Sequence, residues 1–306
     1  MNSLLKTLFN GVLEDMGYPV SLSRLLKIEP GIRFNLARPA SSIAASSVIR
    51  WQDFGKHPAL NWPRRPCGEM LGWQWSGGRY SSFVVQRPEF ESLAQRHDVP
   101  LWRCDISRVD GFSGSKSRLE DFTSTDDMVE TNSIQMIDRI DDDKLAENLA
   151  HHEIRILHDP STSDHFQYCA WDRRVFLMNS GGSHHLAAAK YLAVRLHRRV
   201  PIAGKLVSYS LNSTAIEALC RDFDIFVFKD DAEHLNAFHD AMCSLRATWL
   251  WLPLPHPYDE GRAVFFPRTQ PRSIRASESL RQANLFDLGR HLLDQVTGQR
   301  FLAPAA

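Results

Sequence analysis

Residues 173–202 read RRVFLMNSGGSHHLAAAKYLAVRLHRRVPI, and this stretch decides how the chain around it is interpreted. The apolar run Val175–Met178 predicts a short strand, which the glycine pair at 181–182 ends. Ser183 stands at the predicted N-cap, just before a run of helix formers. A second strand is predicted near Val200–Ile202. The order of strand, glycine turn, helix and strand places a helix N-terminus directly after a strand of a sheet.

The start of this helix is suited to binding an anion. Unpaired N–H groups and the positive end of the helix dipole attract phosphate, and glycines without side chains let it approach. His184 and His185 add hydrogen-bond donors at the same place. Paired glycines before a helix also occur as plain structural turns. The stretch therefore predicts either a turn without a ligand or a phosphate-binding turn made of Gly181, Gly182, Ser183, His184 and His185.

The turn resembles the motif of the sulfiredoxin and ParB-like (ParB/Srx) nucleotide-binding fold. Sulfiredoxins carry Phe-Gly-Gly-Cys-His-Arg between a strand and a helix, and ParB-like domains carry a Gly-His/Glu-Arg-Arg variant. This chain has Ser-Gly-Gly-Ser-His-His at residues 180–185. The resemblance covers residues 134–211. It implies a helix over 145–150 and a strand over 154–157 upstream of the turn, and a strand after the alanine-rich helix.

Two departures from the motif change what the resemblance implies. The cysteine that receives the sulfinyl group in sulfiredoxins is Ser183 here, so sulfiredoxin reductase activity is not expected, because a hydroxyl has a far higher pKa than a thiol. The arginine that grips phosphate is replaced by His185, whose imidazole offers at most two donors. The resemblance still implies binding of a nucleoside triphosphate, ATP or CTP, with Mg2+, and with it phosphoryl hydrolysis or transfer.

Composition sets broad limits on the protein class. The 306 residues are 43% hydrophobic and 24% charged, which is enough apolar sequence for one large or two smaller folded domains. Basic and acidic residues balance at 36 each, so no overall charge favours duplex DNA or an anionic membrane. Five widely spaced cysteines argue against a disulfide framework and favour a reducing, cytoplasmic location. No run is long enough to span a membrane, and no membrane partner is expected.

The N-terminal region is rich in tryptophans set among glycines and prolines. After an amphipathic helix predicted over 1–16, this composition predicts an irregular, β-rich region rather than helices. The rings suit either a stacking surface for single-stranded nucleic acid or the core of a loop-rich fold. Residues 110–127, rich in serine, glycine and charge, predict an exposed loop. The tryptophans concerned are Trp51, Trp62, Trp73 and Trp75.

Two clusters of side chains are candidates for metal binding. Asp141 and Asp142 stand ahead of a helix predicted to begin near Lys144, and their oxygen atoms are ligands that Mg2+ prefers. Carboxylates there also cap a helix and complement its dipole, so both roles stay open. Seven of the 13 histidines fall between residues 147 and 199. No His-x-x-x-His pair with a neighbouring carboxylate lies on one predicted helix, so a metal site there depends on the fold.

The C-terminal third alternates helix and strand. Strands are predicted over 225–228, 248–252 and 263–266, and one amphipathic helix is predicted over 277–296. We therefore predict an α+β protein in three consecutive segments. These are an N-terminal helix with the Trp-rich region (1–127), a ParB/sulfiredoxin-like domain (128–212) and an α/β extension packed on it (213–306).

Two functions are consistent with these patterns. The first is nucleotide or phosphate-ester binding at the glycine turn, with or without phosphoryl chemistry. The second is a catalytically inactive module of the same fold that binds a protein or nucleic-acid partner. The loss of the motif's cysteine and arginine favours the second function, whereas the retained Gly-Gly-x-His favours a surviving anion site.

Overall fold

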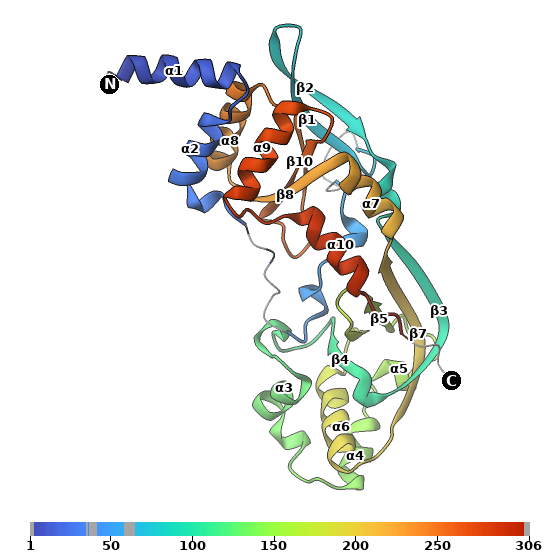
Figure 1. Ribbon diagram of the computed structural model, residues 1–306. Helices are drawn as coiled ribbons and strands as arrows, with labels where there is room; N and C mark the ends of the chain where they lie inside the picture. Colours follow the sequence, from blue (N-terminus) through green and yellow to red (C-terminus); the bar gives the residue numbers. More distant parts are fainter. Residues whose placement is uncertain (1–2, 35, 37–41, 58–64, 303–306) are drawn as a thin grey trace. The chain divides into compact units, whose positions relative to one another are not determined.

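The computed structural model describes residues 3–34, 36, 42–57 and 65–302, and the chain divides into two compact units (Figure 1). Both units combine helices with a five-stranded sheet, so the predicted α+β class is confirmed. The expected segments are consecutive in the sequence, whereas the units interleave. Unit 1 comprises Met1–Leu36, Arg50–Ala94 and Leu211–Thr297, and unit 2 comprises Ala37–Ile49, Gln95–Ser210 and Gly298–Ala306.

The sheet of unit 1 is antiparallel throughout. The β1–β2 turn uses Gly77 and Gly78, both with positive φ, a conformation that residues with side chains rarely adopt. The prediction of β structure in the Trp-rich region is therefore confirmed. In spatial order the strands are β2 (Arg79–Gln86), β1 (Glu69–Ser76), β9 (Trp249–Pro253), β10 (Gly261–Pro267) and β8 (Phe223–Lys229).

Three helices of unit 1 bury their apolar sides against this sheet. Leu22 of α2, Phe238 of α8 and Leu280 of α9 meet Phe226 and Phe266 of the sheet in one buried cluster. Burying each such side chain contributes about 1.5–3 kcal/mol. The helices of the unit are α1 (Ser3–Asp15), α2 (Val20–Ile28), α7 (Ser213–Asp222), α8 (Ala232–Leu245), α9 (Pro271–Gln282) and α10 (Leu288–Gly298).

The single helix predicted over 277–296 is wrong. Helix α9 ends at Gln282 and α10 begins at Leu288, and Asn284 between them has a φ of 56°. A right-handed helix cannot continue through a residue with positive φ. Leu285, in the connecting segment, is buried in the cluster of unit 1. The apolar spacing thus continues across the break, and for this reason the sequence pattern over 277–296 resembles that of one helix.

The sheet of unit 2 mixes parallel and antiparallel pairs. Strands β5 and β6 form an antiparallel hairpin with Phe166 opposite Leu177, whereas β5 pairs with β7, and β6 with β4, in parallel. Strand β6 leads directly into the glycine turn. In spatial order the strands are β3 (Ala94–Asp105), β7 (Pro201–Leu211), β5 (His165–Cys169), β6 (Val175–Met178) and β4 (Val109–Phe112).

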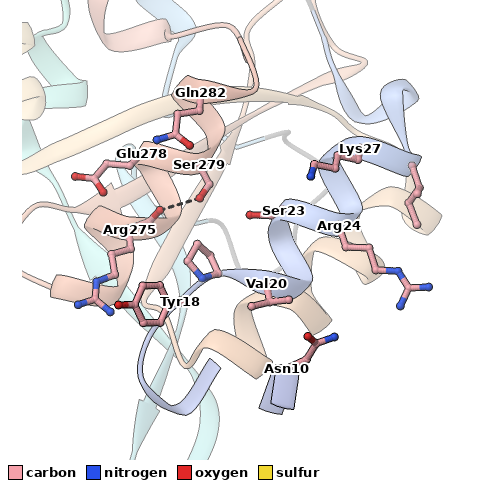
Figure 2. A pocket seen from close by; sticks show the side chains of 12 residues that line it. Asn10, Tyr18, Val20, Ser23, Arg24, Lys27, Arg275, Glu278, Ser279 and Gln282 are labelled. Carbon is pink, nitrogen blue, oxygen red and sulfur yellow. Dashed lines mark hydrogen bonds between the residues drawn. The ribbon is translucent and has the colours of Figure 1, made fainter. Parts of the chain in front are cut away.

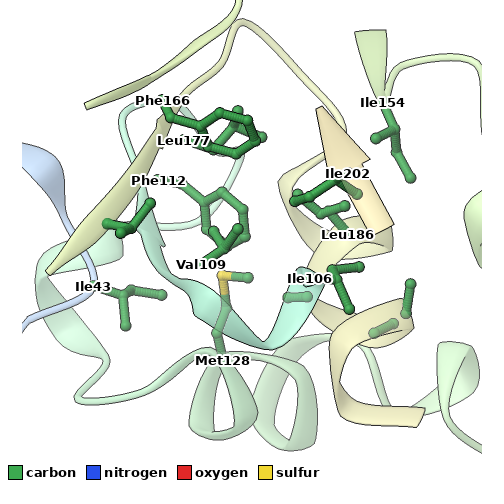
Figure 3. Close-up of a cluster of buried hydrophobic side chains, with 14 of the residues drawn as sticks. Ile43, Ile106, Val109, Phe112, Met128, Ile154, Phe166, Leu177, Leu186 and Ile202 are labelled. Atoms are coloured by element: carbon green, nitrogen blue, oxygen red, sulfur yellow. The ribbon is translucent and has the colours of Figure 1, made fainter. Parts of the chain in front are cut away.

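The core of unit 2 lies between this sheet and its helices. Figure 3 shows Met128 of α3 and Leu186 of α6 in one cluster with Phe112, Phe166 and other strand residues. The run Ala187–Ala189 of α6 is fully buried, and its small side chains let the helix approach its neighbours closely. The helices are α3 (Thr125–Asn132), α4 (Asp142–Leu149), α5 (Arg155–His158) and α6 (Ser183–Arg195).

The prediction of a strand over 154–157, which the family resemblance implied, is wrong. Ile154 precedes the short helix α5, and its N–H donates to the carbonyl oxygen of His151 at 3.0 Å, which is a turn contact. A four-residue apolar run has no periodicity that separates helix from strand. The helix over 145–150 is confirmed by α4, and the helix after the glycine turn is confirmed by α6.

Candidate functional site

The turn between β6 and α6 has the backbone geometry that its glycines predict. Gly182, with a φ of 72°, is the N-cap of α6, so the prediction of Ser183 as N-cap is wrong by one residue. A Cβ on Gly182 would lie 2.6 Å from the carbonyl oxygen of Glu153, so conformation and space both require glycine. No described side chain caps this terminus, which leaves the N–H groups of the first turn without acceptors in the helix.

The loop after β4 is tied to this turn by Asn179. The Nδ2 atom of Asn179 donates to the carbonyl oxygens of Gly114 (3.0 Å) and Gly181 (2.8 Å). Its Oδ1 accepts from the N–H of Gly114 at 3.2 Å, and its own N–H donates to Ser113 Oγ at 2.9 Å. Asn179 is only 7% exposed. The loop is therefore held beside the N-terminus of α6 by partly buried hydrogen bonds.

A cavity of about 790 Å3 lies between this loop and the glycine turn. Its walls come from the loop after β4, the segment after α3, the turn before α5 and the start of α6. Lys116 supplies an exposed ammonium group and Glu153 a half-buried carboxylate. The five residues that the sequence proposes for phosphate binding all line this cavity, namely Gly181, Gly182, Ser183, His184 and His185.

His184 uses both ring nitrogens within the protein. Its Nδ1 lies 2.6 Å from Ser133 Oγ, and its Nε2 lies 3.1 Å from Ser117 Oγ. The Ser117 hydroxyl also accepts from Asn132 Nδ2 at 2.9 Å. Burial lowers the pKa of His184, and the nearby charge of Lys116 lowers it further. His184 therefore connects the end of α3 and the loop after β4 to α6, and both of its nitrogens are engaged.

His185 is held from a different side. Its Nδ1 lies 3.1 Å from Asn148 Oδ1, and its ring stacks on that of His151 with centroids 3.6 Å apart and planes 12° apart. Burial lowers the pKa of His185 to about 4, with a smaller contribution in the same direction from His151. The ring is thus neutral near neutral pH. It does not supply the positive charge of the arginine that the sulfiredoxin motif has at this position.

Comparison with known proteins assigns the chain to a family. A family model matches residues 99–305, which is 207 of the 306 residues. The chain belongs to the family of unknown function DUF6685. Every residue that lines the cavity falls within the matched DUF6685 segment. Searches of curated proteins and of solved structures found no match. No described helix is long and apolar enough to cross a membrane.

Asp141 and Asp142, the predicted magnesium ligands, lie in the DUF6685 segment but at the start of α4, outside the lining of the cavity. Asp141 is the N-cap, and its carboxylate accepts from the N–H of Lys144 at 2.7 Å. Asp142 pairs with Arg198 at 2.8 and 2.7 Å, and this hydrogen bonding lowers its pKa. The capping role is therefore observed at Asp141. Within the described residues, no group of three or more His, Cys, Asp or Glu side chains could hold a metal ion.

The tryptophans of the N-terminal region precede the DUF6685 segment and lie in different environments. Trp51 is fully buried in unit 1. Trp73 stacks on Tyr80 of the neighbouring strand, with ring centroids 6.3 Å apart. Trp75 is 42% exposed. Trp62 lies outside the described residues. Core filling, one of the two roles that the sequence left open, is thus observed at Trp51.

A second pocket lies in unit 1, between α2 and α9 (Figure 2). Its volume is about 720 Å3, and its lining includes Arg24 and Lys27 of α2 and Arg275 and Glu278 of α9. The guanidinium of Arg275 also lies over the ring of Tyr18, 5.4 Å from the centroid. Three cations against one carboxylate make this a basic groove along two helices.

The sequence patterns did not predict several residues that line the cavity. Lys116 and Ser117 fall in the stretch 110–127, which was expected to be an exposed loop but holds part of β4 at its start and part of α3 at its end. The available signal was the run Gly-Ser-Lys-Ser at 114–117, a cation among small polar residues. Its link to the glycine turn depends on Asn179, which bonds to a residue 65 positions away.

Proposed function

We propose that unit 2 binds a phosphate ester, and in the first place a nucleotide, in the cavity beside the β6–α6 turn. The observation that supports this most is that the uncapped N-terminus of a 13-residue helix and the ammonium group of Lys116 meet at one cavity. Helix N–H groups and the helix dipole favour an anion at this position, and a nearby cation strengthens the attraction.

The dimensions of the cavity and the resemblance of its turn support a nucleotide-sized ligand. Its volume of about 790 Å3 lies within the range of about 300–1,000 Å3 that is usual for small-molecule sites. The resemblance of the turn to the ParB/sulfiredoxin motif supports ATP or CTP, and under this proposal unit 2 shares the layout of that fold. Phosphoryl hydrolysis or transfer, if it accompanies binding, would rest on positioning and charge neutralisation.

We propose Mg2+ only as an ion that binds with the phosphates of a nucleotide. Of the carboxylates considered, Glu153 lines the cavity, whereas Asp141 caps α4 and Asp142 pairs with Arg198. A magnesium ion that accompanies a nucleotide would therefore enter the cavity bound to the phosphates, and neither aspartate would hold it. Its role would be to neutralise phosphate charge.

The test is calorimetric titration of the protein with ATP, CTP, GTP, ADP and inorganic phosphate, each with and without Mg2+. Lys116→Gln is expected to weaken binding about tenfold, since a hydrogen bond to a charged group contributes about 1.5–3 kcal/mol and 1.4 kcal/mol is tenfold. Lys229→Gln, an equal change of charge at an exposed residue of unit 1, should leave affinity unchanged. Binding that is absent, or equally affected by both variants, would contradict the proposal.

The basic groove between α2 and α9 favours a second candidate, a module that binds an acidic protein or nucleic-acid partner. Arg24 and Lys27 lie one turn apart on α2 and both contribute to the lining of the groove, with Lys27 directed towards α9, from which Arg275 lines it (Figure 2). Titration with a single-stranded oligonucleotide at two salt concentrations tests this candidate. Steeply salt-dependent binding that Arg24→Gln weakens would support it.

A further inference from the structure

The tautomer of His185 is fixed by a buried amide. Asn148 is 2% exposed, and its Nδ2 donates to the carbonyl oxygens of Met136 (2.8 Å) and Lys144 (3.0 Å). Carbonyl oxygens only accept, so the amide nitrogen must face them and Oδ1 must face His185. Because Oδ1 also only accepts, the hydrogen of the neutral imidazole lies on Nδ1. The other nitrogen, Nε2, therefore carries a lone pair.

This lone pair belongs to a residue of the cavity wall. His185 lines the cavity, and no described residue forms a hydrogen bond with its Nε2. The ring cannot turn over by 180° without losing the contact between its Nδ1 and Asn148. A neutral imidazole with Nδ1–H engaged can only accept a hydrogen bond at Nε2, and an acceptor repels the oxygen atoms of phosphate. His185 is therefore unsuited to holding the phosphate itself.

A second acceptor stands on the same wall. Glu153 lines the cavity, and its Cβ is 3.6 Å from the position that a side chain on Gly181 would take. Its carboxylate and Nε2 of His185 both require hydrogen-bond donors. Lys116 and the first turn of α6, in contrast, supply donors to the cavity. The cavity thus combines groups that attract an anion with groups that repel one.

We infer that the ligand is a phosphate ester whose carbon skeleton carries hydroxyl groups, as a ribonucleotide or sugar phosphate does, and that His185 and Glu153 accept hydrogen bonds from these hydroxyls. This inference rests on the proposed function, because it assumes that Lys116 and the α6 N-terminus hold the phosphate. It makes inorganic phosphate a poor ligand, because a phosphate ion held by Lys116 and the α6 N-terminus has no carbon skeleton whose hydroxyl groups reach the two acceptors.

The experiment compares ligands that differ only in hydroxyl groups. The affinities of AMP and CMP are measured by calorimetry at pH 7.5 beside those of their 2′,3′-dideoxy counterparts and inorganic phosphate. The ribonucleotide is expected to bind about tenfold more tightly than its dideoxy form, since the dideoxy form leaves the two acceptors without donors. In His185→Phe, which keeps a flat ring beside His151, the ratio of ribonucleotide affinity to dideoxynucleotide affinity should fall towards one. The affinity for the dideoxy form should be retained.

Two further variants separate the outcomes. Glu153→Ala should lower the same ratio in part, and Glu278→Ala in the groove of unit 1 should leave it unchanged. If no ligand binds, the proposed function fails and the inference fails with it. If both forms bind equally to the wild type while Lys116→Gln weakens both, the phosphate site stands and the inference is overturned. A ratio that persists in both His185→Phe and Glu153→Ala also overturns it.

Discussion

Gly181 and Gly182 are neighbours in one turn, yet their surroundings tolerate a side chain differently. A Cβ on Gly182 would lie 2.6 Å from backbone oxygen of Glu153 at a φ of 72°, whereas one on Gly181 would lie 3.6 Å from its nearest neighbour. Gly182→Ala is expected to lower the free energy of unfolding by about 1–3 kcal/mol, and Gly181→Ala by less than about 0.5 kcal/mol. Urea unfolding of both variants measures the difference. Equal midpoints would show that the turn relaxes around the added methyl group.

The half-buried imidazole of His185 predicts a pH dependence of stability. Burial lowers its pKa to about 4, against about 6.5 in an unfolded chain, so the unfolded state binds more protons between these values. The free energy of unfolding should therefore fall as the pH falls from about 6.5 to 4, by about 1–2 kcal/mol, because solvent screens the half-buried ring. The titratable groups around the ring are His151, Glu153, His184 and Glu147.

Denaturant unfolding of the wild type and His185→Gln at intervals between pH 4 and 7.5 tests this dependence. The stability difference between the two proteins should change across that range, with the variant losing less stability towards acid. Some slope remains in the variant, because burial also lowers the pKa of His184. A difference that is the same at every pH would contradict the prediction.

At the residue scale, the sequence indicated the turn that borders the cavity but not the contacts of its side chains. Gly181 to His185 are contiguous, so the motif was visible, and all five line one cavity. The states of the histidines depend on distant partners instead. His184 meets Ser117 and Ser133, and His185 meets Asn148 and His151. The donor role first assigned to His185 follows from the residue type alone, whereas its tautomer follows from a buried amide 37 positions away.

At the element scale, sequence patterns predicted several helices and strands correctly, but they misled where a run is too short to show a period and where apolar spacing continues across a break. Strands β8 and β10 contain the runs predicted over 225–228 and 263–266, and β9 overlaps the run predicted over 248–252 in all but its first residue. The run 154–157 is too short to show a period, and in the structure Ile154 closes a turn onto His151 while the residues after it form α5. The break at Asn284 leaves the apolar spacing intact, so only the backbone conformation shows that α9 and α10 are separate.

At the scale of the whole molecule, both units are completed by segments far apart in the chain. Near the start of unit 2, Ile43 accepts a backbone hydrogen bond from Phe112 (2.9 Å) and donates one to Phe122 (3.1 Å). Composition and periodicity describe neighbours in sequence, so they suggested consecutive segments divided near 127 and 212. Interleaving depends on long-range backbone pairing, which these local patterns do not encode.

The C-terminal segment of unit 2 offers a direct test of this interleaving. Arg300 donates its N–H to the carbonyl oxygen of Ala170 (3.0 Å) and accepts from the Tyr168 hydroxyl (2.7 Å). Leu302 packs against the core cluster of unit 2. Ending the chain at Gln299 is expected to cost about 2–4 kcal/mol, because it leaves half-buried polar groups without partners and removes apolar contact.

Hydrogen exchange followed by mass spectrometry locates the effect of this truncation. Amides of β5 and β6 should exchange faster in the truncated chain, whereas those of β8 and β10 in unit 1 should keep their rates, since the lost contacts all lie within unit 2. Tyr168→Phe is the matched control, because it removes one of these hydrogen bonds and should reproduce only about 1 kcal/mol of the loss. Faster exchange spread evenly over both sheets would show instead that the two units unfold as one cooperative structure, in which the C-terminal segment stabilises the whole chain.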